Sequence, residues 1–195
     1  MAGLKDALNR DLVILHKGDT ITVAIYQGVA PGGVVNLEDG WSGGQFVRWV
    51  DAGTGDLTVT LANGVYCGFM PFGSDELGDK YTTLTDSDQT YEKVVMYFGG
   101  NVVYTRTFET ETYQSRHGLA PATPLVYHAN QALYVSENGK ATTEDESNPA
   151  VNPGGNFPDG SPITVPFVFF GVCAVPPFLA PNGSYYMGIQ TNFGV

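Results

Sequence analysis

The sequence has few charged residues and very few basic ones. Charged side chains make up 15% of its 195 residues, well under the roughly 25% of ordinary soluble domains. Lys and Arg number 9 against 20 Asp and Glu, which gives a net charge of −11. That balance argues against binding to nucleic-acid phosphates or to an anionic membrane surface, both of which attract basic proteins. We therefore expect neither nucleic acid nor membrane as a partner.

Cysteines are scarce and long hydrophobic runs are absent. The two cysteines, Cys67 and Cys173, lie far apart in apolar surroundings. We interpret them as buried reduced thiols, with a disulfide as the alternative. Pro166, Pro176 and Pro177 interrupt the longest apolar stretch, residues 163–180, so no uninterrupted apolar run reaches the roughly 18 residues of a membrane span. Lys5 and Asp6 interrupt any signal peptide, so the chain is expected to be made in the cytoplasm and kept in a soluble compartment, without secretion by the usual route.

What the sequence has in quantity is glycine, proline and aromatic residues. It contains 25 Gly, 12 Pro, 11 Tyr and 11 Phe, a composition that favours strands and turns over helices. Runs with strand character recur roughly every 8 to 15 residues, as in all-β domains. The sequence predicts an all-β fold, an antiparallel β-barrel or sandwich with long loops. Residues 1–17 would form an N-terminal arm and first strand, and residues 18–195 the β domain, which an acidic stretch at 73–92 could divide into two lobes.

Turn signals predict where the strands reverse. Asn-Gly or Gly-Gly pairs at 63–64, 99–100 and 138–139 predict three hairpins, and the last is expected to be a tight type I′ turn because both residues tolerate positive φ. Residues 73–92 are predicted to be a polar loop or a solvated edge. Residues 146–162, rich in Pro, Gly and Asn, are predicted to be a long surface loop.

The titratable residues do not form a recognisable metal site. His16, His117 and His128 have no His or Cys at metal-ligand spacing. Asp86 and Asp88 resemble the start of a calcium loop but lack its remaining ligand positions. A solvated acidic loop is the preferred interpretation there, and a weak surface cation site is the alternative. We predict no metal site and no cofactor.

Two carboxylates carry the only candidate for catalysis. Glu109 and Glu111 alternate in sequence, and paired carboxylates can hydrolyse glycosidic bonds. Side chains two positions apart on a strand share a face at about 7 Å in any case, so a solvated strand face is the preferred interpretation. No G-x-S-x-G or glycine-rich phosphate-binding motif occurs. The sequence therefore predicts no catalytic residues and no enzyme.

Two tryptophans suggest a different class of function. Trp41 and Trp49 could stack on sugars, which would make the chain a carbohydrate- or receptor-binding β module. Large aromatic residues more often serve as core or interface anchors. The binding module is kept as the alternative function.

The C-terminal third carries a resemblance to a known family. It reads "PLVYHANQALYVSENGKATTEDES", then "FVFFGVCAVPP" and "YYMGIQTNF". These strand-and-turn patterns, at Pro124-Leu125, Leu133–Lys140, Gly171–Pro177 and Met187–Thr191, resemble the virion structural proteins of tailed bacteriophages, most of all the capsid decoration (cement) proteins. The resemblance implies a non-enzymatic protein on the capsid exterior that binds the major capsid protein across capsomer junctions. A tail or neck component is the alternative within this class.

Composition adds an expectation about assembly. Few charges and many aromatics are typical of chains that bury surface against partners, so we expect a homo-oligomer, a dimer or a trimer. A short helix at residues 2–10 is expected to become ordered against a neighbouring subunit or the shell, because so short a helix is unstable alone. The predicted capsid or subunit contacts are Leu4, Leu8, Trp41, Trp49 and Phe157.

Overall fold

The computed structural model confirms the all-β class. It describes residues 12–16, 19–25, 44–51, 58–64, 68–69, 83–86, 89–157, 160–167 and 169–191. Within these ranges the one helix is α3 (Tyr113–Arg116), a single turn, and all other regular elements are strands. None of the helices described is long and apolar enough to cross a membrane. The short helix expected at residues 2–10 lies outside the described residues.

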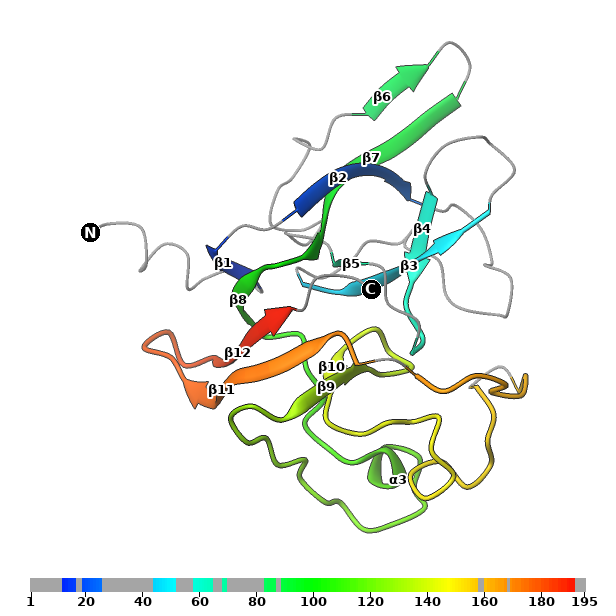
Figure 1. Cartoon of the computed structure of the whole chain (residues 1–195), viewed down its shortest axis with the longest axis vertical. Helices are drawn as coiled ribbons and strands as arrows, with labels where there is room; N and C mark the ends of the chain where they lie inside the picture. The colour runs from blue at the N-terminus through cyan, green and yellow to red at the C-terminus, as the bar shows by residue number, and fades with distance from the viewer. Residues whose placement is uncertain are drawn as a thin grey trace.

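The strands form two sheets, as the sandwich alternative predicts (Figure 1). The first sheet has the order β1 (Leu12–His16), β8 (Val102–Thr105), β12 (Tyr185–Thr191), β11 (Gly171–Leu179), β9 (Ala132–Val135) and β10 (Ala141–Thr142). The second has the order β2 (Asp19–Ile25), β4 (Thr58–Leu61), β3 (Phe46–Val50), β5 (Gly68–Phe69), β7 (Gln89–Gly99) and β6 (Thr83–Asp86). Pairing is antiparallel among the described strands except between β2 and β4. In the second sheet β2 also pairs with β7.

Two of the three predicted hairpins are wrong, because consecutive strands pair elsewhere. The strands on either side of residues 99–100, β7 and β8, belong to different sheets. Asn101, two residues after the end of β7, is hydrogen-bonded to Thr191 at the end of β12. The Asn101 N–H donates to Thr191 Oγ1 at 2.8 Å, and the Thr191 N–H donates to the Asn101 carbonyl at 2.9 Å. The strands around residues 63–64, β4 and β5, both pair with β3 and not with each other.

The third hairpin is confirmed, but its turn is of another type. β9 and β10 pair through Val135 and Ala141. The Gly139 N–H donates to the Ser136 carbonyl at 3.1 Å, and the Ser136 N–H donates to the Lys140 carbonyl at 2.8 Å. Positive φ occurs at Gly139 and not at Asn138. This is the three-residue loop that ends in a left-handed glycine, and not the two-residue type I′ turn that the Asn-Gly pair predicts.

The structure agrees in the main with the predictions for the polar stretch at 73–92 and for the long loop at 146–162. Part of the stretch at 73–92 forms β6 and the start of β7, which pair at one edge of the second sheet, so the edge alternative is correct there. The described part of the loop at 146–162 contains no strand. Its polar composition does not keep it wholly in solvent, since Glu146 and Asn152 are buried.

One hydrophobic core connects the two sheets. Phe46 of β3 and Ala62 after β4 belong to the same cluster as buried residues of the first sheet. The others in that cluster are Val103, Phe108, Tyr127, Leu133, Val135, Ala141, Phe170, Cys173, Met187 and Ile189. The rings of Phe46 and Phe170 are 4.4 Å apart between centroids, so aromatic packing joins the sheets. α3 and the loops around it lie at the end of the molecule away from the β6–β7 hairpin (Figure 1).

Candidate functional site

Glu109 and Glu111 do not form the solvated strand face that the sequence predicts. They lie outside the named strands, and Glu109 is only 4% exposed. Glu109 Oε1 accepts hydrogen bonds from the Ser136 hydroxyl at 2.7 Å and the Asn138 amide at 2.9 Å. Glu111 is half-buried and accepts a hydrogen bond from the Ser115 hydroxyl. The two carboxylates therefore have separate partners and do not act as a pair.

Glu109 belongs to a buried group that we call the Arg116 cluster, formed by Arg116, Glu109, Glu137 and Glu146. Arg116 Nη1 lies 2.9 Å from Glu137 Oε1 and 3.4 Å from Glu109 Oε1, and Nη2 binds Glu146 Oε1. The second Glu146 oxygen accepts the Glu137 N–H at 2.9 Å. One guanidinium thereby joins α3, the β9–β10 turn and the start of the long loop.

The short helix α3 is fixed so that Arg116 points into this cluster. Thr112 caps it by accepting the Ser115 N–H at 3.3 Å, and the Tyr113 N–H donates to Glu144 Oε2 at 2.6 Å. The Arg116 guanidinium carbon lies 5.7 Å from the centroid of the Tyr113 ring, within range of a cation–π interaction. The His117 ring packs 4.3 Å from the Tyr113 ring between centroids.

Burial dominates the electrostatics of the cluster. It raises the pKa of Glu146 to about 7, against the opposing effects of Arg116 and of the Glu137 N–H. Burial alone would lower the pKa of Arg116, but the carboxylates of Glu146, Glu109 and Glu137 outweigh it and raise that pKa. Burial also raises the pKa of Tyr127 far above its usual range, so its hydroxyl stays protonated and donates to the Glu109 carbonyl at 2.7 Å.

The contacts of the Arg116 cluster hold three separate segments of the chain together. Exposed fractions of its side chains are 13% for Arg116 and 2% for Glu146, so water and substrate have little access to it. Each of its three carboxylates has at least one oxygen that is hydrogen-bonded or paired with the guanidinium. Across the described residues no group of three His, Cys, Asp or Glu is placed to hold a metal ion.

The other residues considered as functional candidates do not come together in one site. His117 and His128 are exposed, and His117 Nε2 lies 2.6 Å from Glu137 Oε1. Cys173 is a buried free thiol, as the first interpretation predicts for it, and burial raises its pKa. Cys67 and Asp88 lie outside the described residues.

The predicted contact residues fall into three groups. Trp49, on β3, is 45% exposed and is available to a partner. Phe157 is half-buried and stacks on Phe167 with 6.1 Å between ring centroids, so it packs within the chain. Leu4, Leu8 and Trp41 lie outside the described residues.

An exposed apolar surface on the β11–β12 hairpin was missed by the sequence reasoning. Leu179 and Tyr185 are cross-strand partners near its end, and each is 59% exposed; Val175, further along β11, is 37% exposed. We call Leu179 and Tyr185 the hairpin face. The other side of the hairpin is packed, with Phe178 opposite Tyr186.

The prolines of β11 are the reason that the sequence did not predict this surface. Pro176 and Pro177 suggest a connector between two strands, yet they lie within β11, which continues to Leu179 through two irregularities in its register. A signal was present in the adjacent tyrosines, whose side chains point to opposite sides of β12: Tyr185 is exposed and Tyr186 is fully buried.

Comparisons with known proteins identify no relative: no protein family, no curated protein and no solved structure matches this chain.

Proposed function

We propose that this chain is a non-enzymatic virion structural protein that decorates and stabilises a tailed-phage capsid by binding the major capsid protein across capsomer junctions. The observation that supports binding to a protein surface is the hairpin face, with Leu179 and Tyr185 each 59% exposed. It lies in the C-terminal third, which resembles the decoration proteins, and that resemblance supplies the capsid as partner.

The hairpin face is suited to binding because its support is rigid. Phe178 and Tyr186 pack beneath it, and the Phe178 ring lies 5.3 Å from the Tyr104 ring of β8 between centroids. Anchors held on a packed scaffold lose little conformational freedom on association. Full burial of one such apolar side chain contributes about 1.5 to 3 kcal/mol, so a few anchors repeated over a symmetric shell would give firm attachment.

The prolines in β11 favour binding through side chains over addition of a partner strand. Among the described strands, β9 pairs with β11 only at Gly171 and Val172, so the rest of that edge has no strand beside it. Pro176 and Pro177 have no N–H to offer a partner strand, and proline is one way in which sheet edges avoid unwanted pairing.

The test is sedimentation of the purified protein with capsid shells of the phage that carries its gene, prepared without their decoration protein. Wild type should bind to saturation. The double variant Leu179→Ser/Tyr185→Ser should bind about tenfold more weakly or worse, since truncation of an anchor commonly costs more than 1 kcal/mol. Leu119→Ser is the matched control, because Leu119 is 64% exposed but lies outside the hairpin.

Several outcomes would contradict the proposal. Absence of binding to shells by wild type would overturn it, and binding to purified tails instead would favour the tail or neck alternative. A shift in tryptophan fluorescence on adding a glycan, abolished by Trp49→Ala, would favour the carbohydrate-binding module. We also expect light scattering to show a dimer or trimer, and monomer alone at micromolar concentration would argue against the assembly part of the proposal.

A further inference from the structure

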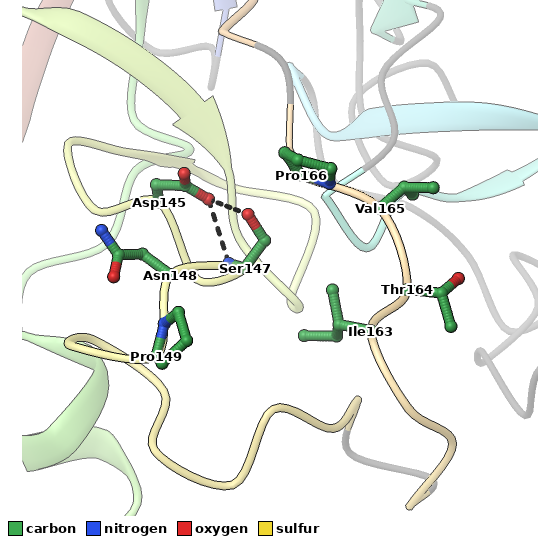
Figure 2. Close-up of a pocket in the computed structure, with 8 residues that line it drawn as sticks. All are labelled: Asp145, Ser147, Asn148, Pro149, Ile163, Thr164, Val165 and Pro166. Carbon is green, nitrogen blue, oxygen red and sulfur yellow. Dashed lines mark hydrogen bonds between the residues drawn. The ribbon is translucent and has the colours of Figure 1, made fainter.

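A pocket of about 380 Å³ opens between two arms of the chain at the two ends of the long loop, residues 145–149 and residues 163–166 (Figure 2). Asp145, Ser147 and Pro149 line one side. Ile163 lies on the opposite arm and points across the gap towards the first. Asp145 and Ser147 make the first side mainly polar, and Ile163 makes the opposite side mainly apolar.

Main-chain hydrogen bonds hold the arms in place. The Ile163 N–H donates to the Gly155 carbonyl and the Phe157 N–H to the Ser161 carbonyl, each at 2.8 Å. The Phe167 N–H donates to the Ser147 hydroxyl oxygen at 2.9 Å, which joins the second arm directly to the first. The pocket thus exists before any ligand arrives, and a ligand does not have to order it.

Asp145 has one carboxylate oxygen in use and one available. Oδ1 accepts hydrogen bonds from the Ser147 N–H at 3.0 Å and from the Ser147 hydroxyl, which fixes the orientation of the half-buried carboxylate. Oδ2 accepts no hydrogen bond from the residues that the structure describes. Asp145 also has no salt bridge within that part of the chain.

The neighbouring charges leave Asp145 without a cation. Glu144 binds the Tyr113 N–H and Glu146 binds Arg116, so both adjacent acids are satisfied elsewhere. Arg116 is already surrounded by three carboxylates. An ionised carboxylate in a concave, partly apolar site is favoured by a cationic hydrogen-bond donor from outside.

The opposite wall suits an aliphatic chain. Ile163 and Pro166 contribute apolar surface to this wall. Lys and Arg side chains combine an apolar stem with a charged head, and they bury the stem along such surfaces. With a net charge of −11, the whole chain also attracts basic segments of a partner.

We infer that this pocket binds a lysine or arginine side chain presented by a partner protein, with the charged head on Asp145 and the stem against Ile163. The identity of the partner as the capsid rests on the proposed function, whereas the chemistry of the pocket does not. The pocket would add a specific charged contact to the apolar contacts of the hairpin face.

The first test uses a short blocked peptide with a central lysine, its arginine counterpart, and a control with norleucine, which keeps the stem and lacks the charge. Titration followed by amide chemical shifts should move residues 145–149 and 163–166 with the two basic peptides only. Asp145→Asn should weaken this binding about tenfold, as for a lost hydrogen bond to a charged group. Asp51→Asn removes an exposed carboxylate outside the pocket lining and should have no effect.

Two outcomes of the titration overturn the inference: equal shifts with norleucine, or shifts with a neutral sugar and none with lysine. A second test separates it from the proposed function. If wild type binds capsid shells and Asp145→Asn binds them as tightly, the pocket is not used and the inference fails while the proposed function stands. If the basic peptides bind at the pocket but wild type ignores the shells, the pocket chemistry stands and the proposed function fails.

Discussion

The Phe46 N–H donates a hydrogen bond of 2.9 Å to the Gly139 carbonyl, which joins β3 of the second sheet to the β9–β10 turn beside the first. The Phe46 carbonyl in turn accepts the Ala62 N–H at 3.0 Å. Gly139 fits this junction because it has φ of +66° and no side chain. A Cβ there would lie 2.3 Å from Leu61 Cδ1 and 3.1 Å from the Phe46 carbonyl oxygen.

Gly139→Ala should therefore destabilise the protein by about 2 to 4 kcal/mol, from left-handed strain of about 1 to 2 kcal/mol and a comparable cost of overpacking. Gly183→Ala is the control: its φ is +82°, but a Cβ there has nothing within 4 Å, so only strain applies. Urea unfolding midpoints would measure both. Equal losses in the two variants would show that contact with Leu61 and Phe46 costs nothing.

The sequence predicts the strands of this fold far better than their pairing. β7 and β8 lie where alternation places them, yet the Gly99-Gly100 pair between them does not make a hairpin. A local turn signal reports that the chain can bend, and it does not identify the partner of the next strand. Here the bond of Asn101 with Thr191, 90 residues away, holds β8 in the other sheet.

The Arg116 cluster was unpredictable for a related reason. Charged residues are rarely fully buried, so Glu109 in a polar segment is expected to face solvent. Its burial depends on Arg116, Ser136 and Asn138, which are brought to it by α3 and by the β9–β10 turn. No spacing along the chain encodes that meeting, because the partners come from separate segments.

Arg116 should be among the most sensitive positions in the protein. Arg116→Met keeps much of the side-chain volume but leaves Glu109, Glu137 and Glu146 buried with no countercharge. Removing one partner of a buried ion pair commonly costs about 3 to 5 kcal/mol, and we expect a loss of that size at neutral pH. Lys140→Met is the control, because Lys140 is exposed and surface changes usually stay within about 0.5 kcal/mol. A similar small change in both variants would contradict the structural role of the cluster.

Tyr127→Phe tests the support beneath the cluster. The Tyr127 hydroxyl donates to the Glu109 carbonyl at 2.7 Å and lies 3.1 Å from the Ala141 carbonyl, both in buried surroundings. The Ala141 carbonyl keeps the Glu109 N–H as a donor at 2.8 Å, so Phe would leave mainly the Glu109 carbonyl without its bond. The expected loss is about 1 to 2 kcal/mol, measured by thermal unfolding. A neutral result would mean that water replaces the hydroxyl.

Glu146 should make the protein less stable as the pH rises. An acid in an ordinary ion pair has a lowered pKa and gives the opposite dependence. Its pKa is raised from 4.5 to about 7 in the folded state, mainly by burial. Between these values the folded protein holds a proton that the unfolded chain has released. Stability from this group is therefore greatest at or below pH 4.5 and falls as the pH rises towards 7, by up to about 3 kcal/mol at roughly 1.4 kcal/mol per unit.

Glu146→Gln removes this titration and keeps an oxygen that can accept from Arg116. The stability of the variant should fall less than that of wild type between pH 4.5 and 8, so the difference between the two curves isolates Glu146 from the other acids. Glu111→Gln, which alters a carboxylate bonded to Ser115 outside the cluster, should leave the wild-type slope in place. Urea midpoints measured across this range would decide, because urea adds no ionic strength. Parallel curves for wild type and Glu146→Gln would mean that Arg116 and the Glu137 N–H hold Glu146 ionised throughout, and that the buried carboxylate is fully compensated by its partners.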